Sequence, residues 1–134
     1  MAFEETILVV DDDAVSRHVL CQTLTDAGLC NVACESGTDA LTYLAEHVPQ
    51  VVLLDLVMPE MDGFEVLKHM KHDAALKDIP VIILTAKSLT EEDAALLRRQ
   101  SQALLQKDGA WKEGLMATLE KVIGERNPEN VERR

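Results

Sequence analysis

Acidic, hydroxyl and ammonium groups follow four short apolar runs of this chain. Such runs are typical of buried parallel strands, and a polar residue directly after one lies at the edge of the sheet. The four junctions are Ile7–Val10 followed by Asp11 and Asp12, Val51–Leu54 followed by Asp55, Val81–Leu84 followed by Thr85, and Ala103–Gln106 followed by Lys107. In doubly wound sheets, ligands bind outside the carboxyl ends of the strands. We therefore expect these polar groups to converge on one site.

The three aspartates at these junctions predict a cation site with a nucleophile beside it. Carboxylates within a few ångströms of one another are costly unless a cation joins them. Mg²⁺ suits such a cleft, because it takes oxygen ligands and is held by one or two carboxylates together with phosphate oxygens. Asp55 can attack a phosphoryl group and form an acyl phosphate. Thr85 and Lys107 would bind the phosphoryl oxygens, which is catalysis by positioning and charge stabilisation.

These motifs resemble the receiver domain of two-component response regulators. The resemblance rests on the acid pair Asp11–Asp12, the D-x-x-M-P-x-M-D-G run at Asp55–Gly63, the pair Thr85–Ala86, and Lys107, and it covers about residues 6 to 124. It implies an α/β fold of the flavodoxin-like (βα)5 type, a doubly wound five-stranded parallel sheet of order 2-1-3-4-5. Residues 1–124 are expected to form a single receiver domain, followed by a polar tail at 125–134.

The resemblance also implies a function and its partners. Asp55 would accept a phosphoryl group from a phosphohistidine on a sensor kinase or phosphotransfer protein, and the domain would then change conformation to signal to an output partner. The metal ligands would be Asp11, Asp12, Asp55 and the backbone carbonyl of Val57. Thr85 and Lys107 would contact the phosphoryl group. Such a domain assists its own phosphorylation but is not a conventional turnover enzyme.

Two positions depart from the usual receiver pattern. Receivers usually have proline after the lysine, often with a cis peptide bond, but here Asp108 follows, and a trans bond is expected because cis bonds without proline cost about 3 kcal/mol. Leu104 stands where the family usually has an aromatic residue whose rotamer follows phosphorylation. In both positions the chain resembles receivers attached to hybrid sensor histidine kinases. Because Leu104 replaces the aromatic residue, the usual aromatic switch is not expected.

The spacing of apolar and capping residues predicts the elements that position this site. Helices are expected from Asp13 to Gly28, from Ser36 or Thr38 to Ala45, around Phe64 to Met70, from Thr90 to about Gln100, and after Gly109 as far as Gly124. A short strand is expected at Cys30–Cys34 in addition to the four apolar runs. In the first helix, Val15, Val19, Leu20 and Leu24 recur at helical spacing and are expected to face the core.

Composition limits the classes of function. The formal net charge of −11 argues against nucleic-acid binding, which needs a positive field. No apolar run approaches the roughly 20 residues of a membrane span, and the acidic start does not match a signal peptide. We therefore expect a cytoplasmic protein without membrane contact. The three cysteines lack paired metal-ligand spacing and are expected to be buried and inert, and His69 and His72 are expected to lie on a solvated helix face.

Two other functions fit part of the pattern. Asp11-x-Asp13-x-Val15 matches the nucleophile motif of haloacid dehalogenase-like phosphatases, with Asp11 as nucleophile, but the acidic pair expected beyond the lysine is missing. A pseudo-receiver would bind a partner without being phosphorylated, although all the acceptor residues are present. Phosphoryl labelling followed by site mapping separates the three alternatives.

Overall fold

The computed structural model describes residues 3–56, 61–86 and 88–126. Within these ranges, strands and helices alternate along the chain, and the strands form one parallel sheet of order β2-β1-β3-β4-β5. The strands are β1 (Phe3–Val10), β2 (Asn31–Cys34), β3 (Val48–Leu54), β4 (Val81–Thr85) and β5 (Ala103–Gln106). The helices are α1 (Ala14–Asp26), α2 (Gly37–Leu44), α3 (Gly63–Lys71), α4 (Glu91–Gln100) and α5 (Trp111–Arg126). The predicted fold class and strand order are confirmed.

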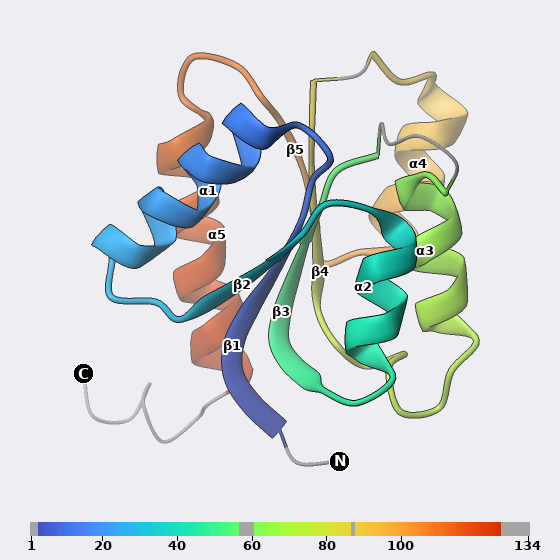
Figure 1. Cartoon of the computed structure of the whole chain (residues 1–134). Helices are drawn as coiled ribbons and strands as arrows, with labels where there is room; N and C mark the ends of the chain where they lie inside the picture. Colours follow the sequence, from blue (N-terminus) through green and yellow to red (C-terminus); the bar gives the residue numbers. More distant parts are fainter. Residues whose placement is uncertain (1–2, 57–60, 87, 127–134) are drawn as a thin grey trace.

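The helices cover both faces of the sheet, with α1 and α5 on one side and α2, α3 and α4 on the other (Figure 1). Successive side chains of a strand point to opposite faces. In β1, Ile7 and Val9 pack with the buried side chains of α1 and α5, whereas Leu8 and Val10 pack with those of α2, α3 and α4. Both faces of the inner strands are therefore apolar, which explains why these runs are unbroken in the sequence.

Side-chain caps begin four of the helices. The capping residues are Asp13, Ser36, Asp62 and Thr90, each of which accepts a hydrogen bond from the backbone N–H three residues later. At the other end of α1, Gly28 has φ +79°, and the following Leu29 N–H donates to the carbonyl of Leu24 at 2.9 Å. Glycine adopts this left-handed conformation without the steric cost that a side chain would bring. The predicted start and end of α1 are thus confirmed.

The prediction that Val15 faces the core is wrong: the residue is 72% exposed. An α-helix turns about 100° per residue, so Val15 lies almost opposite the stripe formed by Leu20 and Leu24. The residue that continues this stripe toward the helix N-terminus is Ser16, four residues before Leu20. Strict helical periodicity, counted back from Leu24 and Leu20, would have predicted that Ser16 and not Val15 lies on the inward face.

Other element boundaries also differ from the predicted ones, and β1 begins at Phe3 rather than Ile7. Helix α5 does not end at Gly124 but continues to Arg126. A glycine ends a helix when it adopts positive φ, and Gly28 is the only described glycine that does so. Strand β3 begins at Val48 rather than Val51 and includes Pro49, where only β1 pairs with it. A proline is tolerated there because the missing N–H is not needed by a second neighbouring strand.

No helix in the described ranges is both long enough and apolar enough to cross a membrane.

Candidate functional site

Backbone hydrogen bonds continue the parallel ladder one residue beyond three of the strands. The N–H of Asp11 donates to the carbonyl of Cys34 at 3.1 Å, and that of Asp55 donates to the carbonyl of Val10 at 3.0 Å. Between β4 and β5, the N–H of Lys107 donates to the carbonyl of Thr85 at 3.0 Å. The chemically interesting residues are therefore held by the sheet itself and not by free loops, which limits their positional freedom.

The three predicted metal-binding aspartates lie together at this edge. One carboxylate oxygen from each of Asp11, Asp12 and Asp55 can be chosen so that all three lie within 4.8 Å of one another. Asp11 is buried, Asp55 is half-buried and Asp12 is exposed. They border an open cleft of about 470 Å³, whose lining residues are Asp11, Asp12, Asp13, Ser16, Asp55, Ala86 and Lys107. In the described part of the chain this is the one group of three or more such side chains close enough to share a metal ion.

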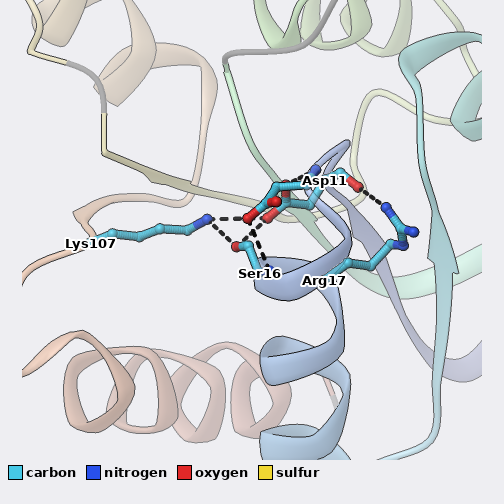
Figure 2. A network of polar contacts seen from close by, with 5 residues as sticks. Asp11, Ser16, Arg17 and Lys107 are labelled. Carbon is cyan, nitrogen blue, oxygen red and sulfur yellow. Dashed lines mark hydrogen bonds and ion pairs between the residues drawn. The ribbon is translucent and has the colours of Figure 1, made fainter.

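Lys107 reaches across the cleft from the end of β5 to Asp11 (Figure 2). Its ammonium lies 3.1 Å from Asp11 Oδ2 and 2.5 Å from Ser16 Oγ, and the Ser16 hydroxyl lies 2.6 Å from the same Asp11 oxygen. The other carboxylate oxygen of Asp11 accepts the backbone N–H of Asp13 at 2.9 Å. The buried charge of Asp11 is thus compensated by two side chains and one backbone donor, as a buried carboxylate requires.

Arg17 fixes the same loop from the other side (Figure 2). Its Nη1 donates to the backbone carbonyl of Asp11 at 2.9 Å, and its Nη2 lies 4.0 Å from the exposed carboxylate of Glu35 after β2. The exposed ion pair contributes little, because water screens it. The bond to the carbonyl holds the backbone that presents Asp11. Helix α1 therefore contributes two side chains, Ser16 and Arg17, that were not among the predicted site residues.

Thr85 and Val57 are the remaining residues predicted for the site. Thr85 is the last residue of β4 and is fully buried, and it does not line the cleft, whereas the adjacent Ala86 is exposed and does. Val57, whose carbonyl was the predicted fourth metal ligand, falls outside the described residues. The side chain of Ala86 is small and lines the open cleft.

Gly63 brings the end of the β3–α3 connection back against the end of β3. Its N–H donates to the carbonyl of Leu56 at 3.1 Å. A Cβ at this position would lie 2.5 Å from the carbonyl oxygen of Asp55 and 2.8 Å from the Cα of Leu56. Both are backbone atoms, so a side chain at position 63 would force the segment that carries Asp55 to move. The close approach at Gly63 therefore constrains the backbone around Asp55.

The segment after β5 runs without a cis peptide bond, as the absence of proline predicted; none of the described peptide bonds is cis. The N–H of Asp108 donates to the carbonyl of Gln106, and its carboxylate accepts the N–H of Ala110 at 3.1 Å, so that Asp108 organises the start of α5. Leu104 is half-buried against the core on the α2, α3 and α4 side of the sheet.

The cysteines only partly match their predicted burial. Cys34 is buried and Cys21 half-buried, but Cys30 is exposed. Burial raises the pKa of the Cys34 thiol, and the negative charge of Asp39 adds to that rise. Burial also raises the pKa of Cys21 more than the nearby Arg17 lowers it. Thiolate formation is disfavoured at both residues, which makes them poor nucleophiles.

His69 and His72 are exposed, as predicted. Together with Glu65 and Lys68 they border an open hollow of about 420 Å³ on α3. The Nδ1 atom of His72 lies 2.8 Å from the carbonyl of Lys68, one turn back in the same helix. This contact lies within α3, and both histidines are exposed, so they lie on a solvated face of the helix.

Comparisons with known proteins agree with this geometry. A family model described as the response regulator receiver domain matches residues 7–120. The phosphate regulon transcriptional regulatory protein PhoB of Escherichia coli is 33% identical over 126 residues, which cover 94% of this chain and 55% of PhoB. The chain thus spans about half the length of that curated relative.

Two solved structures are also similar. The N-terminal domain of a response regulator receiver protein from Methanoculleus marisnigri is 37% identical with a TM-score of 0.72, covering 88% of this chain and 95% of that one. The response regulator TrrA from Thermotoga maritima, solved in complex with Mg²⁺ and BeF, is 29% identical with a TM-score of 0.78, covering 89% of this chain and 99% of that one.

Proposed function

Since the chain belongs to the response regulator receiver domain family, we propose that it is a phosphoacceptor signalling domain with Asp55 as the acceptor. The observation that carries the proposal is the meeting of Asp55 with Asp11, Asp12 and Lys107 at one edge of the sheet. This cleft combines a carboxylate nucleophile with groups suited to hold a cation and to neutralise a phosphoryl group.

The donor set fits Mg²⁺. Three carboxylates from the ends of β1 and β3 offer hard oxygen ligands, and the open cleft leaves room for water and phosphate oxygens. Asp11, Asp12 and Asp55 would hold the ion, with the carbonyl of Val57 as a further ligand. When bound, the ion would withdraw charge from the phosphoryl oxygens during transfer. The complex of the similar TrrA with Mg²⁺ and BeF supports this assignment.

The reaction is a transfer of one phosphoryl group between two nucleophiles. A carboxylate oxygen of Asp55 attacks the phosphorus of a phosphohistidine, the bond from phosphorus to the imidazole nitrogen breaks, and an acyl phosphate forms on Asp55. Lys107 would move from Asp11 to a phosphoryl oxygen. Thr85 is buried directly before the cleft-lining Ala86, so its hydroxyl would have to turn toward the cleft to donate to a second phosphoryl oxygen. The domain is consumed stoichiometrically by this step and is not a conventional enzyme.

The donor belongs to the same proposal. A sensor histidine kinase or a histidine phosphotransfer protein would present its phosphohistidine at the open side of the cleft beside Ala86. Because such donors are phosphorylated with ATP, the transfer would occur in the cytoplasm. The output partner would recognise the conformation of the phosphorylated domain, as the family membership implies.

Incubation with acetyl phosphate and Mg²⁺, followed by intact mass measurement, tests the function. We expect the mass to rise by one phosphoryl group, and we expect the rise to disappear when EDTA replaces Mg²⁺. A chain that gains no mass under conditions that phosphorylate a known receiver domain would be a binding module rather than a phosphoacceptor.

Mg²⁺ should stabilise the folded chain through the acidic cleft. At ten times its Kd, a ligand that binds only the native state adds about 1.4 kcal/mol. For a chain of this size, this corresponds to an increase in Tm of roughly 4–7 °C. Thermal unfolding followed by circular dichroism, with and without MgCl₂, measures the shift, which should be lost in Asp11→Asn and Asp12→Asn.

Asp13→Asn is the matched control for this experiment. It removes one charge from the same acidic triplet, but asparagine preserves the N-cap of α1 that Asp13 supplies. The Mg²⁺ shift should persist in this variant. If all three variants lose the shift equally, the effect reflects the general acidity of the loop and not coordination by Asp11 and Asp12.

Lys107→Ala should slow phosphorylation by acetyl phosphate about 10²-fold, the usual effect of removing one donor to a charged transition state. Stopped-flow or mass measurements of the rate at saturating Mg²⁺ provide the value. Lys112→Ala, which removes an exposed lysine at the start of α5, should leave the rate unchanged. Equal rates in the two variants would remove Lys107 from the transfer step.

A further inference from the structure

Ser16 contacts both Asp11 and Lys107, two charged groups that must separate if Lys107 is to reach the phosphoryl group. Its Oγ is 2.6 Å from Asp11 Oδ2 and 2.5 Å from Lys107 Nζ, while those two atoms are themselves 3.1 Å apart (Figure 2). The three atoms form a closed triangle across the cleft. Ser16 is not one of the residues by which the family is recognised in this sequence.

The direction of these hydrogen bonds follows from chemistry. An ammonium can only donate and an ionised carboxylate can only accept, so the Ser16 hydroxyl donates its proton to Asp11 and accepts from Lys107. Lys107 therefore has two oxygen acceptors on the same side of the cleft. Its side chain is only 18% exposed and that of Asp11 only 1%, so water competes weakly with these contacts.

The hydroxyl is not needed to form the helix. The backbone N–H of Ser16 is capped by Asp13 Oδ2 at 3.1 Å, and this bond does not involve the Ser16 side chain. Alanine is a better helix former than serine. The side chain at this inward-facing position is therefore better explained by its contacts with Asp11 and Lys107 than by the stability of α1.

We infer that Ser16 is a positioning residue that retains Lys107 at Asp11 until a cation binds the acidic cleft. An ammonium 3.1 Å from Asp11 repels a divalent cation at the same carboxylate, so the two compete. The bond from Lys107 to Ser16 exists only while the lysine remains at Asp11. It therefore stabilises the metal-free arrangement and raises the Mg²⁺ concentration at which Lys107 is released toward Asp55. This inference rests on the proposed function.

Isothermal titration with MgCl₂ tests the inference without any phosphoryl transfer. Ser16→Ala should bind Mg²⁺ about 3- to 10-fold more tightly than the unmodified chain, the effect of a typical net hydrogen bond that favours only the metal-free state. Ser16→Thr keeps a hydroxyl at the same position and should restore the original affinity. Thr23→Ala, which removes a hydroxyl that bonds within α1 to the carbonyl of Val19, controls for a general change in the helix.

A double-mutant cycle with Lys107→Ala identifies the route of the effect. In the Lys107→Ala background, Ser16→Ala should no longer tighten Mg²⁺ binding, because no lysine remains to be retained. The NMR chemical shifts of the Lys107 side chain (Hε, Cε) supply a second readout, because they should change when Mg²⁺ releases Lys107 from Asp11. In Ser16→Ala this change should be complete at a correspondingly lower Mg²⁺ concentration.

The outcomes separate this inference from the proposed function. Unchanged or weaker Mg²⁺ binding by Ser16→Ala, or equal tightening with and without Lys107, would overturn the role of Ser16 while leaving the metal site intact. Failure of the unmodified chain to bind Mg²⁺ at Asp11 and Asp12 would overturn the metal site itself, and the inference with it.

Discussion

Asp55→Asn is expected to abolish phosphoryl uptake from acetyl phosphate. The substitution preserves the size of the side chain but replaces the anionic oxygen nucleophile with a neutral amide, which does not form an acyl phosphate. The backbone bond from Asp55 to the carbonyl of Val10 does not depend on the side chain, so the end of β3 should stay in place. Intact mass measurement after incubation with acetyl phosphate and Mg²⁺ should give the unmodified mass only.

Asp62→Asn provides the matched control for this variant. Asp62 caps α3 by accepting the N–H of Glu65 at 3.1 Å, and asparagine caps equally well. The control therefore removes one carboxylate from the connection that follows β3 without removing the proposed acceptor. Phosphoryl uptake by Asp62→Asn should equal that of the unmodified chain. Uptake by Asp55→Asn at the same level would show that the acceptor is another residue.

Gly63→Ala should destabilise the chain and disturb the acceptor together. The added Cβ would lie 2.5 Å from the carbonyl oxygen of Asp55, and backbone atoms cannot move aside as the end of a flexible side chain can. We expect a loss of about 2–4 kcal/mol in the free energy of unfolding, the range of large effects from overpacking and backbone strain. Urea denaturation followed by circular dichroism measures it.

Gly114→Ala controls for the general effect of replacing a glycine with alanine. Gly114 lies in α5, is exposed, and has open space where its Cβ would be. Alanine in an exposed helix interior should therefore stabilise the chain by up to about 1 kcal/mol. Opposite signs for the two substitutions would confirm that the cost at position 63 arises from the close approach to Asp55. A neutral Gly63→Ala would mean that the β3–α3 connection adapts without displacing the acceptor.

Much of the fold could be predicted because the apolar runs and capping residues are local signals. The strands that end at Asp11 and Asp55 are inner strands with two covered faces, so their composition alone indicates burial. The strand order was implied by the family resemblance and not by periodicity. Local signals were weaker where tertiary packing decides: Gly124 stays helical in α5, and Val15 faces solvent although its residue type favours the core.

The site was predicted from residues that follow strands, and what was missed comes from a helix. Ser16 opens the inward stripe that continues through Leu20 and Leu24, four residues apart. A polar residue at the end of a buried stripe, next to an acidic pair, was the available signal. Arg17 binds a backbone carbonyl, and no pattern of residue types indicates such a bond in advance. The contact of Lys107 with Asp11 depends on three-dimensional distances that spacing along the sequence does not contain.

The structure also bears on the alternative nucleophile. Asp11 is buried, and both of its carboxylate oxygens already accept hydrogen bonds, from Asp13, Ser16 and Lys107. Such a carboxylate is less available to attack phosphorus than the half-buried Asp55. The phosphatase mechanism through Asp11 therefore has no support from the geometry, and the strand order and family match favour the receiver.

Mapping the phosphorylated residue tests the central claim most directly. After incubation with acetyl phosphate and Mg²⁺, borohydride reduces an acyl phosphate of aspartate to homoserine, and peptide mass spectrometry then locates the reduced residue. We predict homoserine at position 55 and at no other aspartate, in an amount equal to the phosphoryl group gained by the intact chain. Homoserine at position 11, accompanied by continuous release of phosphate, would contradict the assignment and indicate a phosphatase that uses Asp11 as its nucleophile.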